Sequence, residues 1–329
     1  MIVKWMAVLC ALVATAMNAG AQTSPAQVWP TRPVTVVVPF AAGGPIDVVA
    51  RLIGPRLSEL LGQQIIVENI GGAGGMLGAS RVATAAPDGY MLLLGNQATH
   101  TYSQFLYKKP LYDPVAEFMP AGLVVGNSKV LTVRKDLPVT TLQDFVAYAK
   151  QNQKTMQYGS AGIGSATQIT CLLLNGRLGV DVTHVPYRST THAMQDLVAG
   201  RIDYLCDIVS TALPQIRGNS VKAIALMAKT RSPVLPDLPT ALEQGVADVD
   251  ADGWNAFFFP KGTPDAIVRR LAAATDEALN TPAVRKRIEE LGLDVPPPEQ
   301  RGPNYLTGLV KHELEKWGPP IKAAGITLN

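Results

Sequence analysis

The chain has 329 residues, of which 47% are hydrophobic and 17% are charged. This length is sufficient for two domains with separate cores. The formal net charge is only +3, and the 29 Lys and Arg residues are scattered along the chain, so the composition gives no support for nucleic-acid binding.

The first residues have the pattern of a secretory signal peptide. Lys4 supplies a positive start, AVLCALVATA is an apolar run, and Ala19-Gly20-Ala21 offers small residues for cleavage. We expect residues 1–21 to be removed. No later stretch reaches the roughly 20 apolar residues of a membrane span, so the mature protein is expected outside the cytoplasm, in the periplasm of a Gram-negative cell.

Strand-like and helix-like segments then alternate, which predicts an α/β fold with mainly parallel sheets flanked by helices. Aliphatic runs predict a first series of strands at residues 34–40, 64–70 and 91–96, and a second series at 130–136, 156–161, 182–188, 202–209 and 221–228. A last strand is expected at 254–260, followed by helices. Pro319 and Pro320 are expected to break or restart the final helix.

A strand that returns after the second series favours two α/β lobes joined by segments that cross between them. We expect lobe 1 to contain residues 22–125 and 241–329, and lobe 2 to contain residues 126–240. Two sequential domains are the alternative, although no Pro-, Ser- or Gly-rich linker marks a boundary. The crossing segments are expected to act as hinges beside a ligand cleft.

The stretch VPFAAGGPID at residues 38–47 joins the first strand to a helix. Gly43 and Gly44 permit positive φ or the close approach of another molecule. A helix start carries unpaired N–H groups and partial positive charge, so this junction suits a carboxylate or a phosphate. The alternative is an ordinary glycine turn in which Asp47 caps the helix.

The same arrangement recurs in the second series, in MQYGSAGIGSATQ. The strand ends at Ser160, Gly162 and Gly164 form the turn, and Ser165 and Thr167 open a helix and add hydroxyl donors. Open α/β sheets bind ligands at the carboxyl ends of their strands. One such turn in each lobe therefore predicts an anion site in the cleft.

Two other glycine motifs lack an essential residue. GGAGGMLG has Leu77 where a dinucleotide-binding loop needs its last glycine, and is interpreted as a flexible loop that leads into a helix. GIGSA has Ala166 where a nucleophile elbow needs its second glycine. A hydrolase that uses Ser165 would also need a base, and His184 and His192 are expected at the surface or in packing. We therefore expect no catalysis.

Two charged residues are further candidates. Asp207 lies in the apolar stretch IDYLCDIVS, where a carboxylate needs a partner or a wet cleft. It is interpreted as an acceptor for a ligand ammonium or hydroxyl group, with a hydrogen bond to the lobe backbone as the alternative. Arg188 offers positive charge to an anion, but is also compatible with an exposed loop.

Cys171 and Cys206 remain after signal cleavage, in a compartment that oxidises thiols, and are either bridged or buried apart. Neither has metal-ligand spacing to His100, His184, His192 or His312, so no metal site is expected. No cofactor motif is present.

Many segments in order resemble the periplasmic substrate-binding proteins of the tripartite tricarboxylate transporter type, the Bug receptor family. The matching stretches are WPTRPVTVVVPFAAGGPIDVVAR, LGQQIIVEN, GGAGGMLGA, APDGYMLLLGN, SAGIGSATQ, HVPYR, MQDLVAGRIDYLCD, LPQIR, RSPVLPDLPTALEQG and KGTPDAIVRRL. The resemblance implies a two-lobed periplasmic-binding-protein fold joined by crossover strands. It also implies a receptor that binds a small organic carboxylate between the lobes and delivers it to the membrane subunits of such a transporter. A periplasmic sensor that feeds a signalling system is the alternative.

The resemblance also implies which residues form the site. Two loops grip the carboxylate, the residue matching Asp207 faces the cleft, and a cysteine pair at 171 and 206 supports a disulfide. The candidate ligand-binding residues are Phe40, Ala42, Gly43, Gly44, Ile46, Asp47, Asn96, Ser160, Gly162, Gly164, Ser165, Ala166, Thr167 and Asp207. We expect a monomer without a cofactor.

Departures from the family pattern bear on the ligand. Ile46 replaces a small polar residue and Ile208 replaces Asn or Gln, so each removes hydrogen-bonding groups from the far side of the pocket. Ser189 and His192 replace Gly and Pro. These changes predict a carboxylate with a less polar remainder, such as an aromatic or branched acid, rather than citrate.

Overall fold

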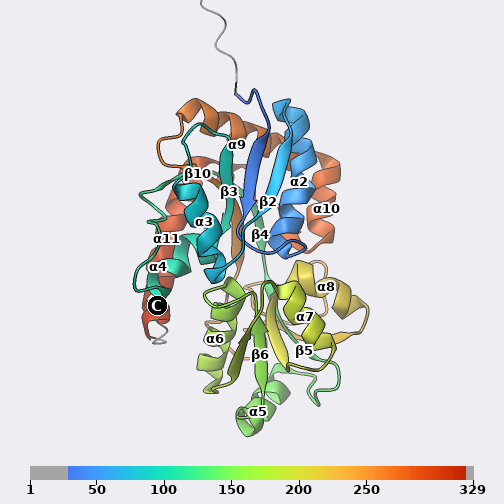
Figure 1. Cartoon of the computed structure of the whole chain (residues 1–329). Coiled ribbons are helices and arrows are strands. Elements are labelled where there is room, and N and C mark those ends of the chain that lie inside the picture. Colours follow the sequence, from blue (N-terminus) through green and yellow to red (C-terminus); the bar gives the residue numbers. More distant parts are fainter. Residues whose placement is uncertain (1–28, 324–329) are drawn as a thin grey trace, which may run out of the picture.

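The computed structural model describes residues 29–323, which form two lobes, each built round one β-sheet (Figure 1). The expected signal peptide and its cleavage site near Ala21 lie outside the described residues. Within the described part of the chain, no helix is long and apolar enough to cross a membrane.

Lobe 1 contains a six-stranded sheet in the order β11-β4-β10-β3-β1-β2. Its strands are β1 (Val34–Val38), β2 (Ile65–Asn69), β3 (Met91–Asn96), β4 (Phe118–Asn127), β10 (Gly253–Pro260) and β11 (Leu293–Asp294). Its helical segments are α2 (Pro45–Leu61), η1 (Ala73–Gly75), α3 (Met76–Ala83), η2 (Ala98–Tyr102), α4 (Ser103–Leu106), α9 (Asp265–Asn280), α10 (Pro282–Glu290), η3 (Pro298–Gln300) and α11 (Pro303–Ala323).

Lobe 2 contains a five-stranded sheet in the order β7-β6-β8-β5-β9. Its strands are β5 (Lys129–Arg134), β6 (Gln157–Ser160), β7 (Thr183–Pro186), β8 (Tyr204–Ile208) and β9 (Val221–Leu226). Its helices are α5 (Leu142–Asn152), α6 (Ala166–Leu178), α7 (Thr190–Val198) and α8 (Val209–Arg217).

Both sheets are mixed, whereas mainly parallel sheets were expected. β1 pairs in parallel with β2 and β3, and β6 pairs in parallel with β7 and β8. The remaining pairs, those of β10, β4 and β11 in lobe 1 and of β5 with its neighbours in lobe 2, are antiparallel. Parallel pairing is confined to the strand–helix–strand units, which supply the loops of the candidate site.

The chain crosses from one sheet to the other between Asn127, the end of β4, and Lys129, the start of β5. It returns between β9 and β10. The expected lobe boundaries at 125/126 and 240/241 remain a prediction. The sequence analysis missed β4, because Pro120 interrupts its apolar pattern. The strand tolerates this proline beside a register shift against β10.

The C-terminal helix is continuous, so the expected break at Pro319 is wrong. α11 runs from Pro303 to Ala323. Trp317 and Ile321, on either side of the prolines, are almost fully buried in the core of lobe 1. Packing of these two side chains outweighs the loss of a backbone hydrogen bond near a helix end.

Continuous aliphatic runs form strands here because both faces of each sheet are covered. Val34, Val36 and Val38 of β1 face one hydrophobic cluster, and Val37 faces another on the opposite side of the sheet. This alternation is the two-residue period of a strand. The first cluster also includes Ile208 of lobe 2, so the two lobes are in contact.

Candidate functional site

The loop between β1 and α2 is organised by Asp47, which is only 3% exposed. Asp47 Oδ2 accepts hydrogen bonds from the Gly43 N–H and Arg51 Nε, both at 2.9 Å, and Oδ1 accepts one from Asn69 Nδ2 at 3.0 Å. Burial opposes ionisation, but these hydrogen bonds outweigh it and lower the pKa of the carboxyl. Both oxygens are therefore engaged within lobe 1, where Asp47 holds the loop in shape.

The loop between β6 and α6 is held by side-chain oxygens in the same way. Ser165 is the N-cap of α6 and accepts from the Gln168 N–H. Thr167 Oγ1 accepts from the Ala161 N–H at 3.0 Å, and Gln168 Oε1 accepts from the Gly164 N–H at 2.6 Å. The loop thus has one defined conformation.

His184 supports this loop from β7. Gln168 uses its Oε1 on Gly164, so its Nε2 donates to His184 Nδ1 at 3.2 Å. His184 Nε2 therefore carries the ring proton and donates to Ser160 Oγ at 2.6 Å. Burial lowers the pKa of His184 to about 4, which keeps the ring neutral, as this chain of hydrogen bonds requires. His184 is thus a half-buried structural residue rather than a base.

The glycine amides are used inside these loops. The N–H groups of Gly43, Gly44, Gly162 and Gly164 donate to Asp47 Oδ2, Ala41 O, Ser160 Oγ and Gln168 Oε1. Gly43, Gly162 and Gly164 have positive φ, the conformation that favours glycine. The glycines therefore shape the loops. Ser160 Oγ donates to the Gly162 carbonyl, and one of the Ser165 and Thr167 hydroxyls donates to the other. The second hydroxyl of that pair and the helix N-termini remain as donors to a ligand.

Each loop contacts a neighbouring segment of the opposite lobe across the cleft. Thr191 Oγ1 of α7 donates to the Gly43 carbonyl at 2.9 Å. Gly74 lies so close to the opposite loop that an added Cβ would be 2.7 Å from the Ile163 carbonyl oxygen. The lobes are therefore closed on each other at the rim of the cleft.

A small cavity of about 30 Å³, which we call the inner cavity, lies between the lobes behind this rim. Its walls come from both lobes: Phe40, Pro45, Ile46, Asn96, Ala161, Ser165, Ala166, Thr167, Ser189, Thr190 and Ile208. Six of these, Phe40, Ile46, Asn96, Ser165, Ala166 and Thr167, are among the candidate residues of the sequence analysis. The cavity has room for about one water-sized group.

A larger hollow of about 1180 Å³, the outer groove, lies on the solvent side. Phe40 and Ala161 line both spaces, and the candidates Ala42 and Gly162 line the groove. The other lining residues are Ala41, Asn69, Gly71, Gly72, Ala73, Gly74, Gly75, Tyr107, Ile163, Pro186, Tyr187, Arg188 and His192. Arg188 is the only residue of this lining with a permanent charge.

Five other candidates line neither space. Gly43, Gly44, Asp47, Ser160 and Gly164 build the loops without lining either space.

Asp207 is fully buried on β8 and does not line the inner cavity, although its neighbour Ile208 does. Asp207 Oδ1 accepts from the Ile208 N–H at 2.7 Å, whereas Oδ2 has no hydrogen-bond partner among the described residues. Burial raises the pKa of Asp207 to about 7, opposed by the Ile208 amide and the Thr190 hydroxyl.

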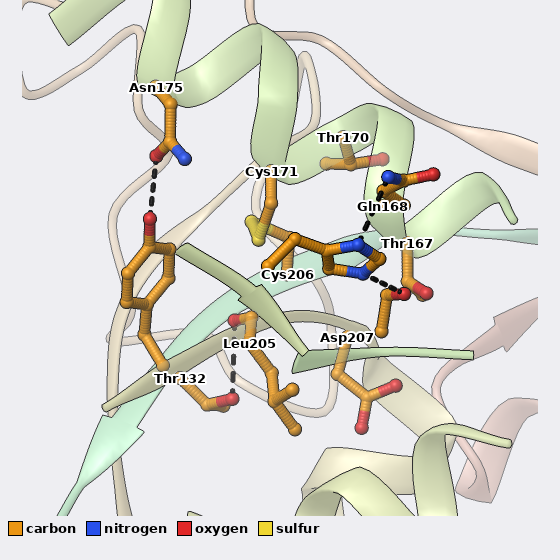
Figure 2. The surroundings of a disulfide bond; sticks show 12 residues. Thr132, Thr167, Gln168, Thr170, Cys171, Asn175, Leu205, Cys206 and Asp207 are labelled. Atoms are coloured by element: carbon orange, nitrogen blue, oxygen red, sulfur yellow. Dashed lines mark hydrogen bonds between the residues drawn. A yellow bond between two sulfur atoms is a disulfide. The ribbon is translucent and has the colours of Figure 1, made fainter. Parts of the chain in front are cut away.

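Cys171 and Cys206 lie at disulfide distance, with sulfur atoms 2.21 Å apart and Cα atoms 5.4 Å apart. The pair joins α6 to β8, and Asp207 points away from it on the other face of the strand (Figure 2). The cysteine pair therefore ties the helix that carries Thr167 to the strand that carries Asp207.

Sequence reasoning missed Pro45, Ala161 and Thr190 in the inner cavity and most of the outer groove. Thr190 opens α7 directly after a strand and a short loop, the same signal as at Gly43 but without a glycine to draw attention to it. The segment Gly71–Gly75, interpreted as a flexible loop, forms a wall of the groove. Arg188 lines the groove and is exposed.

Two α/β lobes that close over a cleft at the carboxyl ends of their parallel strands define a two-lobed solute-binding protein. Within residues 29–323, no three His, Cys, Asp or Glu side chains are grouped to hold a metal ion. Residues 49–326 match the family described as the tripartite tricarboxylate transporter family receptor. The chain belongs to this family, whose members are periplasmic solute-binding receptors and not enzymes.

Individual relatives agree with this assignment. A UPF0065 protein from the ttuE-ttuC' intergenic region of Agrobacterium vitis is 42% identical over 297 residues, 90% of this chain and 86% of that protein. MatC from Rhodopseudomonas palustris, solved with bound malate, is 44% identical with a TM-score of 0.87, over 89% of this chain and all of MatC. The periplasmic binding protein BugD is 37% identical with a TM-score of 0.88, over 91% of this chain and all of BugD.

Proposed function

We propose that this protein is an extracytoplasmic receptor that binds a small organic carboxylate in the cleft between its lobes. The observation that carries the proposal is that four helices from both lobes begin at the inner cavity. Ile46, Thr167 and Thr190 lie in the first turns of α2, α6 and α7, and Ile208 is the N-cap of α8. Helix N-termini carry partial positive charge and unpaired N–H groups, so their convergence stabilises an anion.

The side chains of the cavity favour the same ligand. Ser165, Thr167, Ser189 and Asn96 contribute polar hydrogen-bonding groups, and neither aspartate nor glutamate is among the residues that line the space. MatC, a relative with 44% identity, was solved with bound malate, which is a carboxylate.

The remainder of the ligand is inferred from Ile46 and Ile208, which face the same cavity from opposite lobes. These side chains offer no hydrogen bond, so an additional carboxylate beside them would be desolvated without compensation. We infer a carboxylate with an aromatic or branched remainder rather than citrate. The remainder would extend past Phe40 towards the outer groove.

An acid is larger than the inner cavity, so its entry requires the lobes to part. We infer a rotation about the crossing segments, between lobe 1 (residues 22–125 and 241–329) and lobe 2 (residues 126–240). Both lobes contact the ligand only when closed, so binding shifts the equilibrium towards the closed form.

We further infer that the closed form delivers the acid to the membrane subunits of a tripartite tricarboxylate transporter, and that the receptor is a periplasmic monomer released by signal cleavage near Ala21. Membership of the receptor family supports this partner. A periplasmic sensor remains the second candidate. Uptake of the bound acid by cells lacking the receptor gene would distinguish the two, since only a transport receptor makes uptake depend on the gene.

Thermal-shift screening of the mature protein, followed by calorimetric titration, tests the proposed function. We expect stabilisation by aromatic or branched carboxylates and none by their uncharged amides. An amide that stabilises as strongly as its acid would contradict carboxylate recognition. Stabilisation by citrate but not by monoacids would contradict only the inferred remainder.

A further inference from the structure

Asp207 is a carboxyl that makes no ion pair with any of the described residues. It is fully buried on β8, and its Oδ1 accepts a hydrogen bond from the Ile208 N–H at 2.7 Å. The Thr190 hydroxyl also favours the ionised form of the carboxyl. Burial outweighs these two donors and raises the pKa of Asp207 to about 7. The side chain therefore exchanges its proton near neutral pH.

Asp207 lies one residue behind the wall of the inner cavity. It does not line the cavity, but Ile208 and Thr190, the two residues that stabilise its charge, both do. Thr190 is the first residue of α7, and Ile208 is the N-cap of α8. The hydroxyl and the helix N-termini that would hold a ligand carboxylate therefore also act on Asp207.

A ligand carboxylate and an ionised Asp207 compete for these groups. The Thr190 hydroxyl carries one proton, so it donates to one of the two carboxylates at a time. Two buried negative charges this close also raise each other's pKa. An ordinary carboxylic acid has a pKa of about 4, whereas that of Asp207 is already about 7. A single proton shared by the pair therefore goes to Asp207.

No other charged side chain relieves this competition. The elements packed against β8 are α6, α7, α8, β5 and β6. Their side chains that carry a charge or titrate near neutral pH are Lys129, Arg134, Arg177, His192, Asp196 and Arg217. Arg217 is exposed, and each of the others has a partner other than Asp207. The pKa of Asp207 has only three causes: burial, the Ile208 amide and the Thr190 hydroxyl.

We propose that binding of the ligand carboxylate is coupled to protonation of Asp207, so that the receptor takes up a proton from solvent together with the acid anion. Protonated Asp207 donates to Thr190 Oγ1, and the Thr190 hydroxyl then donates to the ligand. Asp207 is thus a positioning residue that acts through Thr190 without touching the ligand. This inference rests on the proposed function, because it requires a carboxylate in the inner cavity, and it adds a dependence of binding on pH.

The direction of that dependence follows from the two states of Asp207. Below pH 7 the carboxyl is protonated before the ligand arrives, so affinity is highest there. Above pH 7 binding must add the proton, so affinity falls as pH rises until the pKa of the bound form is passed. If binding raises the pKa by one unit or more, affinity should fall about fivefold or more between pH 6.5 and 8.5.

Titration calorimetry on the full mature protein tests the coupling with the tightest binder among malate, phenylacetate and 3-methylbutanoate, whose carboxyl groups stay ionised over this range. We expect the fivefold fall in affinity. Binding enthalpies at pH 7.5 in phosphate and in Tris should report uptake of about half a proton or more. A flat affinity without proton uptake would overturn the inference and leave the proposed function intact. Failure of all three acids to bind would overturn both.

Asp207→Asn distinguishes coupling from a structural role. Its amide donates to Thr190 without carrying a charge, as the protonated carboxyl does. The variant should bind at pH 8.5 about as tightly as the parent binds at pH 6.5, without proton uptake. Weaker binding than the parent at pH 8.5 would overturn the inference. Asp294→Asn is the matched control and should keep the parent's pH profile. Burial also raises the pKa of Asp294, but this residue lies on β11 and lines neither space.

The remaining variants test the other groups near the ligand. Histidine changes its charge in this pH range, and His192 lines the outer groove, so His192→Gln should keep the proton uptake. Uptake that is lost in His192→Gln and kept in Asp207→Asn would overturn the assignment. Desolvation lowers the pKa of the half-buried His184 to about 4, so that ring stays neutral throughout. Thr190→Val should weaken binding at pH 6.5, whereas Thr190→Ser should not. Unchanged affinity in Thr190→Val would overturn the role of this hydroxyl.

Discussion

Gly74→Ala is expected to weaken ligand binding without a matching loss of lobe stability. Gly74 belongs to lobe 1, but a Cβ placed on it would lie 2.7 Å from the Ile163 carbonyl oxygen and 2.8 Å from the Gly164 carbonyl carbon, both in lobe 2. The two loops must separate by roughly 0.5 Å or more to restore ordinary contact distances. The added methyl therefore acts against the closed arrangement of the lobes.

The magnitude follows from the cost of overpacking, about 1–3 kcal/mol. If the ligand binds the closed form, this cost appears in the binding free energy, so affinity should fall by about 5- to 150-fold. Alanine at the positive φ of 61° also costs about 1 kcal/mol of backbone strain, which lowers the melting temperature but not the affinity.

Gly62→Ala separates these two costs. Gly62 ends α2 with a φ of 72°, and no atom lies within 4 Å of an added Cβ. It should lose a similar amount of stability to chemical denaturation and keep its affinity in titration calorimetry. If folded Gly74→Ala binds as tightly as the parent protein, the contact is not part of the bound state and the closure argument fails.

Three further outcomes are expected. In the parent protein the free energy of unfolding should fall by up to about 4 kcal/mol between pH 4 and 7, because the Asp207 carboxyl has a pKa of about 7 in the folded state and its ordinary, lower pKa in the unfolded state. Asp207→Asn should lack this fall, as measured by urea titration at each pH. Cys171→Ala should cost about 3–4 kcal/mol, since the pairing with Cys206 closes a loop of 35 residues. Ile46→Thr should raise the affinity for citrate relative to an aromatic monoacid, measured by calorimetry.

Each of these outcomes has a control. Desolvation lowers the pKa of His100 to about 3 and that of the half-buried His184 to about 4, so these neutral histidines make stability rise with pH up to about 6.5 in variant and parent alike. The Asp207 effect therefore appears as the difference between variant and parent. An identical pH dependence of the free energy of unfolding in the parent and in Asp207→Asn would contradict the raised pKa of this buried carboxyl. A non-reduced mass without the 2 Da loss of a disulfide would refute the cysteine pair. If Ile46→Thr keeps the parent's ratio of affinities for citrate and the aromatic monoacid, Ile46 does not contact the ligand.

Much of the fold could be predicted because its signals are local. β-branched runs such as VTVVV form strands, and the glycine junctions before α2 and α6 mark helix starts. β4 was not predicted, because Pro120 interrupts its local pattern and the strand is stabilised by its pairing with β10, which is distant in sequence. The continuity of α11 through its prolines was not predicted for a similar reason, since the burial of Trp317 and Ile321 depends on the rest of lobe 1.

For the site, the sequence indicated the two loops but not which atoms stay free. Whether the Gly43 or Gly164 amide faces a ligand depends on Asp47 and Gln168, whose side chains fold back onto them. Thr190 and the wall at Gly71–Gly75 come from loops next to the two glycine junctions in space. Only the packing of the lobes brings them together.

The account's central claim is that one carboxylate is held by both lobes at once. A crystal structure of the protein with the acid it retains through native purification tests this most directly. We predict the carboxylate within about 2.7–3.2 Å of Ser165 or Thr167 in lobe 2 and of the start of α2 in lobe 1. A carboxylate bound by a single lobe, or outside the cleft, would contradict the account.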